Sequence, residues 1–120
     1  MLSYEIQAFG QRLGLENLTL NHEGLAQLNI EGIGSFFLEH DEQGSRSQLL
    51  IYLSAPLPDH DTATPRRLLE ACDYRRAIPM PLSAGVFSGR AILLTRMDEQ
   101  AVSAAAIENA FRFLADVLHA

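Results

Sequence analysis

The most informative segment of this sequence is Leu25-Ala-Gln-Leu-Asn-Ile-Glu-Gly-Ile-Gly-Ser-Phe-Phe-Leu-Glu-His40. Apolar and polar residues alternate near its start, which is the period of a β-strand with one buried face. Glu31-Gly32 is a suitable two-residue turn. The segment therefore predicts a β-hairpin whose strands span 25–30 and 33–40.

The position of this turn predicts which side chains share a face of the hairpin. With Glu31-Gly32 as the whole turn, Ile30 lies opposite Ile33, and the rest of the pairing follows from that register. The other face then carries Leu25, Phe36 and Leu38. A slip of one residue would move all of these side chains to the opposite face.

The remaining segments predict helices and strands around this hairpin. Leu2, Ile6, Phe9 and Leu13 are spaced as on one face of a helix. Further along, we expect a polar loop over 41–46, a strand over 48–54, a helix over 66–75 capped by Thr64, a hairpin over 82–87 and 90–97 around Ser88-Gly89, and a closing helix capped by Asp98 or Ser103. The order α-β-β-β-α-β-β-α predicts an α+β fold in a single domain over 1–120, with a twisted, mostly antiparallel sheet packed by helices.

Large apolar residues occur on both faces of the predicted sheet. In the third strand, Leu49, Ile51 and Leu53 lie on one face, whereas Leu50 and Tyr52 lie on the other. An antiparallel sheet usually keeps one face in water and therefore polar. Three helices, one of them short, are few for two apolar faces, so a second subunit or a partner chain is one candidate cover. The alternative is that the helices pack on both faces and leave nothing exposed.

Composition narrows the classes of function. The chain has 120 residues and a formal charge of −6, and its nine basic residues are all arginine. Nucleic acid is not an expected partner, because its phosphate backbone requires clustered positive charge. Neither membrane insertion nor a secretory signal is expected, since the apolar stretches are too short. The single cysteine, Cys72, cannot form an internal disulfide, and the expected location is the cytoplasm.

No convergent set of catalytic or metal-binding residues is evident in the sequence. The densest cluster, Asp59-His60-Asp61, lies in a proline-rich loop without a second half, and a solvated turn explains it better. Cys72 lies on the apolar side of its predicted helix, where free cysteine usually packs as a small hydrophobic group. We therefore expect no enzyme, no catalytic residue, no metal and no cofactor; the alternative is an unusual active site in the 59–61 loop.

Several segments together form the pattern of a known family. They are Leu13-Gly-Leu15, Leu25-Ala-Gln-Leu-Asn-Ile30, Gln48-Leu-Leu-Ile-Tyr-Leu53, Arg66-Arg-Leu-Leu-Glu-Ala-Cys72, Gly85-Val-Phe-Ser-Gly-Arg-Ala-Ile-Leu-Leu94 and Ala110-Phe-Arg-Phe-Leu114. In a small acidic chain with this order of elements, they resemble the class I chaperones of bacterial type III secretion, the Tir-chaperone family. The resemblance covers nearly the whole chain.

The resemblance implies how the chain assembles. Members of the family are ATP-independent homodimers in which the short middle helix pairs with its twin. On this chain, Leu68, Leu69 and Cys72 are therefore the expected residues of the dimer interface. A heterodimer with a second chaperone is compatible with the sequence as well.

The resemblance also implies a function. Family members bind an extended N-terminal segment of a type III secretion effector or apparatus protein, partly at sheet edges, and keep it soluble and secretion-competent. The client contacts expected on this chain are Leu25, Phe36, Leu38, Leu50 and Tyr52. The alternative function is a small non-catalytic regulatory or scaffolding domain that binds a folded protein partner.

Overall fold

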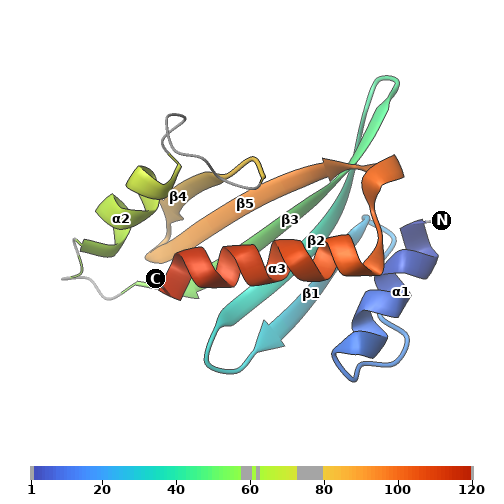
Figure 1. Ribbon diagram of the computed structural model, residues 1–120, viewed down its shortest axis with the longest axis horizontal. Helices are drawn as coiled ribbons and strands as arrows, with labels where there is room; N and C mark the ends of the chain where they lie inside the picture. Colours follow the sequence, from blue (N-terminus) through green and yellow to red (C-terminus); the bar gives the residue numbers. More distant parts are fainter. Residues whose placement is uncertain (1, 58–60, 62, 73–79, 120) are drawn as a thin grey trace.

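The predicted order of elements is present in the computed structural model of the protein, which describes residues 2–57, 61, 63–72 and 80–119. Its elements are α1 (Leu2–Arg12), β1 (Leu25–Ile30), β2 (Gly34–Gln43), β3 (Arg46–Pro56), α2 (Ala63–Ala71), β4 (Ser83–Phe87), β5 (Arg90–Asp98), a short 3₁₀ turn η1 (Glu99–Ala101) and α3 (Ala104–His119) (Figure 1). They form a single α+β domain.

The five strands form one antiparallel sheet with the order β1-β2-β3-β5-β4. β1 and β4 are therefore the edge strands. The β4–β5 hairpin turns at Ser88-Gly89, as predicted, and these residues have φ values of 51° and 75°. Positive φ at both central positions is the backbone of a type I′ turn, which suits the twist of a hairpin.

β2 and β3 are longer than predicted. Most of the expected loop over 41–46 belongs to these strands, which turn at Gly44-Ser45. Polar side chains pair across this extension, since Gln48 Nε2 donates a hydrogen bond of 3.0 Å to Asp41 Oδ2. Polarity alone therefore did not mark a loop here.

The first hairpin differs from its prediction by one residue. Ile30 pairs with Gly34 rather than Ile33, so three residues rather than two connect the strands. A two-residue type I′ turn would require positive φ at Glu31, which glutamate rarely adopts. In the structure only Gly32 of that pair has positive φ, at 80°. The turn needs one further residue, and the predicted register was therefore wrong.

This shift of register changes the position of two predicted client contacts. Phe36 and Leu38 lie opposite Leu28 and Ala26, on the face that the helices cover. Their side chains are 0% and 1% exposed. The prediction that they share a face of the sheet with Leu25 was wrong, because a one-residue slip reverses the direction of every side chain in the strand.

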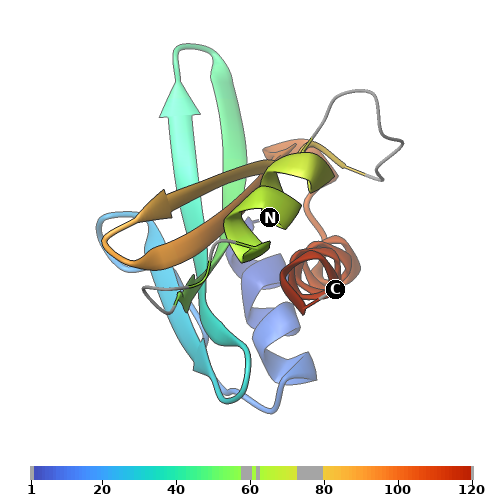
Figure 2. The ribbon, with the colours of Figure 1, turned by 90° about the vertical axis from the view of Figure 1, so that its left-hand side faces the viewer.

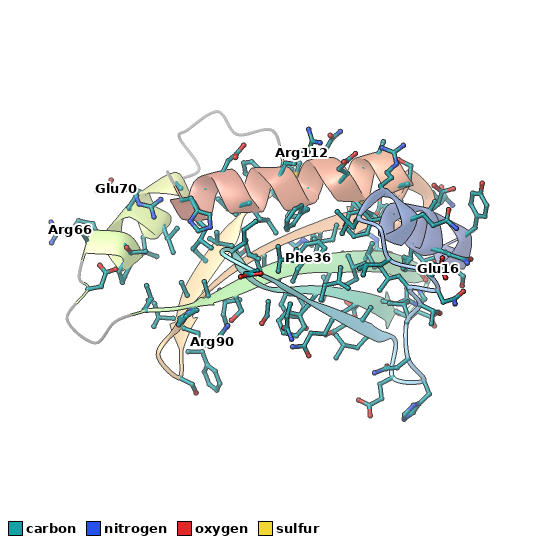
Figure 3. All side chains as sticks on the ribbon, turned by 90° about the horizontal axis from the view of Figure 1, so that it is seen from below. Glu16, Phe36, Arg66, Glu70, Arg90 and Arg112 are labelled. Atoms are coloured by element: carbon teal, nitrogen blue, oxygen red, sulfur yellow. The ribbon has the colours of Figure 1, made fainter. Side chains whose placement is uncertain are left out.

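All three α-helices lie on one side of the sheet (Figures 2 and 3). α3 packs along β3 and β5, α1 packs beside α3, and α2 packs on β4. Phe36 lies beneath them, with its ring centroid 5.9 Å from that of Phe9 in α1 and 4.9 Å from that of Phe111 in α3. The core is thus a single layer between one sheet face and the helices; Ile6, Leu49, Ile51, Leu53, Leu93, Ile107 and Leu114 also contribute to it.

Contacts between α1 and α3 fix the start of α3. Ser103 is its N-cap, because Ser103 Oγ accepts a hydrogen bond of 3.0 Å from the backbone N–H of Ala106. Glu5 of α1 accepts another, of 2.9 Å, from the N–H of Ala104. Satisfying these N–H groups from a second helix also ties the two helices together.

α2 is capped by a residue other than the predicted one. Asp61 Oδ1 accepts hydrogen bonds from the N–H groups of Ala63 and Thr64, at 3.1 and 3.0 Å. The helix begins at Ala63, so Thr64 lies inside it and is not the cap. The predicted extension of this helix to Arg75 falls outside the described residues.

Arg67 joins α2 to the end of α3. Its guanidinium donates hydrogen bonds to the backbone oxygens of Val117 and Leu118, the latter at 2.7 Å. These carbonyl groups belong to the last turn of α3, where the helix has no further N–H groups to offer them. A positive charge at a helix C-terminus is also favourable to the helix dipole.

Candidate functional site

The sheet face opposite the helices is apolar at its centre. None of the described helices covers it, and its apolar side chains are partly exposed (Figure 3). We call this surface the open face and define it by Leu25, Phe37, Leu50, Tyr52, Ile92 and Leu94. Apolar side chains gathered on an uncovered sheet face are a candidate site of interaction with another polypeptide.

Three of the five predicted client contacts belong to the open face. Leu25, Leu50 and Tyr52 are partly exposed on it, as expected. The structure places Phe36 and Leu38 in the core, where no partner can reach them in this conformation. Only part of the predicted set is therefore brought together at one surface.

Sequence reasoning missed Phe37 and did not select Ile92 or Leu94 as contacts. The predicted hairpin register placed Phe37 on the face opposite Leu25, away from the predicted client contacts. A signal for a longer turn was available in Gly34, since a glycine beside a turn can adopt a backbone conformation that other residues avoid. Ile92 and Leu94 lay on the correct face of the second hairpin, but its alignment with β3 was unknown until the sheet order was seen.

Phe37 and Tyr52 form the centre of the open face. Their rings are stacked, with centroids 4.8 Å apart and planes 15° from parallel. Tyr52 Oη donates a hydrogen bond of 3.1 Å to Glu39 Oε1. Burial of the ring is the main cause that raises the pKa of Tyr52 to about 12, and the hydrogen bond to Glu39 and the negative charge of Glu39 act in the same direction. Tyr52 is therefore a neutral hydrogen-bond donor at physiological pH, and it presents a flat ring to any partner.

Both edges of the sheet offer unpaired backbone groups. Just before β1, Gly24 O accepts a hydrogen bond from the backbone N–H of His40 on β2. Along an antiparallel pair of strands, every second residue forms hydrogen bonds with the neighbouring strand, and the residues between them do not. The N–H and C=O groups of Gln27 and Asn29 therefore point away from β2. By the same alternation, Ala84 and Val86 direct theirs away from β5. An extended polypeptide can pair with either row of groups.

A second apolar surface lies where α2 meets β4. Pro65, Leu68, Leu69, Ala84, Gly85 and Val86 line a shallow groove there, which we call the α2–β4 groove.

The α2–β4 groove contains two of the three predicted dimer contacts, and the third lies one residue beyond α2. Leu69 and Val86 are 64% and 55% exposed, whereas Leu68 is 1% exposed and packs inside the subunit. Cys72 is half-buried, and burial raises the pKa of its thiol, which disfavours the reactive thiolate. Leu69 and Cys72 are thus available to a neighbouring chain, and Leu68 supports the groove from beneath.

The described residues hold no arrangement suited to catalysis. Within the described ranges, no group of three or more His, Cys, Asp or Glu side chains is placed to bind a metal ion. Asp59 and His60 of the predicted cluster lie outside those ranges, and Asp61 caps α2. Among the helices that the structure describes, none is long and apolar enough to cross a membrane.

In the described part of the chain, three α-helices lie on one side of a five-stranded sheet, and the uncovered apolar face on the other side is suited to binding a polypeptide (Figure 3). The chain belongs to the family of the type III secretory system chaperone SycN, whose model matches residues 2–119. It is therefore a type III secretion chaperone, a non-catalytic, cytoplasmic, protein-binding protein. No curated protein matches it in sequence.

Solved structures of secretion chaperones share this fold. A chain of the ExsC–ExsE complex superimposes with a TM-score of 0.74 at 19% identity, covering 96% of this chain and 86% of that one. A chain of the HopA1–SchA chaperone–effector complex gives 0.73 at 16% identity, covering 97% and 88%. The Yersinia pestis chaperone SycH, in complex with a fragment of YscM2, gives 0.66 at 16% identity, covering 98% and 99%.

Proposed function

We propose that this chaperone holds an extended N-terminal segment of a secretion effector or apparatus protein against its open face and sheet edges. The segment stays unfolded, soluble and competent for secretion while it is bound. The observation that carries the proposal is the uncovered apolar face around Phe37, Tyr52 and Leu94. ATP is not needed, because burial of apolar surface and main-chain pairing supply the binding free energy.

The geometry suits an extended client better than a folded one. Alternate side chains of a β-strand point in one direction, about 7 Å apart, which matches the spacing of open-face side chains along β3 and β5. Hydrogen bonds to Gln27 and Asn29 at the edge of β1 would hold the client backbone without regard to its sequence. A broad contact area is needed, since ordering an unfolded chain costs conformational entropy.

The similar solved structures support this proposal. One similar structure is described as a chaperone–effector complex, and another holds a chaperone with a stable fragment of its partner. In each case the chaperone is bound to a second polypeptide. A polypeptide partner is therefore the natural occupant of the open face.

Dimerisation through the α2–β4 groove belongs to the same proposal. Leu69 and Cys72 would contact the twin helix, with Leu68 packed beneath them. The outward groups of Ala84 and Val86 would add main-chain contacts, because an exposed strand edge readily pairs with another chain. A homodimer places two open faces on one particle and lengthens the path available to a client.

Co-purification tests the client proposal. The tagged chain, expressed in its native host, should bring down a polypeptide in which limited proteolysis reveals a protected, non-globular segment. Leu50→Ser with Leu94→Ser should weaken that complex about tenfold or more, because two apolar contacts are lost. Tyr4→Ser is the matched control: Tyr4 is 68% exposed on α1, on the helix side.

A folded partner would give a different result. Under the scaffolding alternative, the bound protein resists protease as a complete folded unit. Client binding that is unchanged in the double variant would contradict the use of the open face. Far-ultraviolet circular dichroism of each variant shows that the sheet itself is intact.

A further inference from the structure

Glu39 places a carboxylate among the apolar side chains of the open face. It lies on β2, and its neighbours across the sheet are Leu25 on β1 and Leu50 on β3. Phe37 precedes it by two residues and therefore shares its face of the strand. Glu39 is partly buried. A client segment that covers these apolar side chains also covers the carboxylate.

One oxygen of this carboxylate is held by the fold and the other is not. Tyr52 Oη donates a hydrogen bond of 3.1 Å to Glu39 Oε1. Within the described part of the chain, no donor is bonded to Oε2, and no arginine or histidine forms an ion pair with Glu39. The phenol of Tyr52 is neutral, so its hydrogen bond leaves the negative charge of Glu39 in place.

The arginines on the same side of the sheet lie away from Glu39. Arg96 is on β5, two strands from β2, which separates the two backbones by about 10 Å. Arg46 and Arg96 line one depression together with Asp98, whose charge offsets theirs in part. Arg90, at the other end of the face, donates hydrogen bonds to β3 instead. In this structure none of these three arginines neutralises Glu39.

The surroundings of Glu39 suit a guanidinium group. A charged group that loses its water is stabilised again only by an opposite charge and by hydrogen bonds. The stacked rings of Phe37 and Tyr52 adjoin the carboxylate, since Tyr52 is hydrogen-bonded to it. Aromatic faces attract cations, and the planar guanidinium of arginine both stacks on such rings and donates to carboxylates.

We infer that the client segment carries an arginine whose guanidinium binds Glu39 beside the rings of Phe37 and Tyr52. This inference rests on the proposed function and adds a chemical requirement to it. In an extended client, the side chains two residues before and after the arginine face the same way and meet apolar surface. Apolar contacts alone allow such a segment to slide by two residues, because the same side chains still face the sheet. The ion pair with Glu39 selects one register.

Two synthetic peptides test the requirement. Both alternate Val and Thr, and they differ only at one central Val position, which is arginine in the first peptide and citrulline, an uncharged analogue of the same shape, in the second. Fluorescence anisotropy should show the arginine peptide binding the wild-type chain about three- to tenfold more tightly, as expected for a partly exposed ion pair beside aromatic rings. This advantage should shrink at high ionic strength.

Variants assign the advantage to Glu39. It should be lost in E39Q, which keeps the shape of the side chain and removes its charge. It should be kept in D116N, which removes the same charge from an exposed position of α3, on the helix side of the sheet (Figure 2). The two variants have the same net charge, so the comparison separates one site from the overall charge of the chain.

Each other outcome has a definite meaning. Equal binding of the two peptides to the wild-type chain would overturn the inference and leave the proposed function standing, since the chain would then neutralise Glu39 by itself. An advantage that survives in E39Q, or that D116N removes as well, would also overturn it, because the attraction would then come from the formal charge of −6 as a whole. Failure of both peptides to bind would contradict the proposed function, and the inference with it.

A second copy of the chain is the competing source of a cation for Glu39. Sedimentation velocity separates the two possibilities. E39Q should sediment as the wild-type chain does, because Glu39 faces a client. A lower mass for the variant would assign Glu39 to self-association and overturn the inference.

Discussion

At the scale of single residues, Gly34 determines which side chains of the first hairpin are buried. It begins β2 with φ of 147°, a backbone conformation that favours glycine. A Cβ at this position would lie 2.4 Å from Ser54 O on β3. The pairing of Gly34 with Ile30 therefore depends on the absence of a side chain, and the buried positions of Phe36 and Leu38 follow from that pairing.

We predict that Gly34→Ala lowers the free energy of unfolding by about 2–4 kcal/mol, from backbone strain together with the clash at Ser54. Urea denaturation measures this change. Gly85→Ala is the matched control in β4, because Gly85 does not have positive φ and a Cβ there meets nothing within 4 Å. Equal stability of the two variants would show that the register does not depend on Gly34.

Client-contact residues could be predicted from the sequence only in strands whose register was predicted correctly. The alternation in β3 correctly separated Leu50 and Tyr52 from the buried Leu49 and Ile51. The predicted register of the first hairpin was wrong because the length of its turn depends on the φ angles of Glu31 and Gly32, which composition alone does not determine. The positions of Ile92 and Leu94 beside Ser54 and Tyr52 could not be predicted, since they depend on the alignment of β3 with β5.

At the scale of elements, Arg67 anchors α2 to the rest of the domain. α2 is short, and among its residues only Leu68 is fully buried. The hydrogen bonds from Arg67 to the last turn of α3 therefore carry much of its attachment. The sequence alone gives no indication that Arg66 and Arg67 differ in this respect.

We predict that Arg67→Met lowers the free energy of unfolding by about 1–3 kcal/mol, because two charge-assisted hydrogen bonds are lost and two helix carbonyls are left unpaired. Thermal denaturation measures the change. Arg66→Met is the control, since Arg66 is exposed on the same helix (Figure 3). A larger effect of the Arg66 variant would contradict the anchoring role of Arg67.

Most elements were predictable because each has a strong local signal. The stripe of apolar residues in α3, the Ser88-Gly89 turn and the alternation in β3 are all patterns within one segment. The first and last residues of the helices and strands were harder to predict from the sequence. The cap of α2 and the length of the β2–β3 hairpin depend on polar partners that the sequence does not identify, such as Asp61 for α2 and Gln48 for Asp41.

At the scale of the whole molecule, the α2–β4 groove and the open face are two separate apolar surfaces. Their separation allows assembly and client binding to be disturbed independently. We predict that Leu69→Asp converts the proposed dimer into a monomer, since it places a carboxylate in an apolar contact. Sedimentation velocity at several protein concentrations measures the mass.

Tyr4→Asp serves as the control for this prediction, because Tyr4 is similarly exposed, at 68% against 64% for Leu69. That variant should keep the mass of the wild-type chain. A wild-type chain that sediments as a monomer would refute the proposed assembly, whatever Leu69→Asp does. Retention of the dimer in Leu69→Asp would move the interface away from α2.

Because every α-helix that the structure describes packs on the same side of the sheet, the residues that hold the domain together and those proposed to select its partner lie on opposite surfaces of the same strands. Successive residues of β3 thus have different roles: Ile51 packs in the core, and Tyr52 lies on the face proposed to bind the partner. Substitutions of open-face residues can accumulate without changing the packing of the core. A lineage of such proteins can therefore acquire new cargo through outward-facing changes while its architecture is inherited intact.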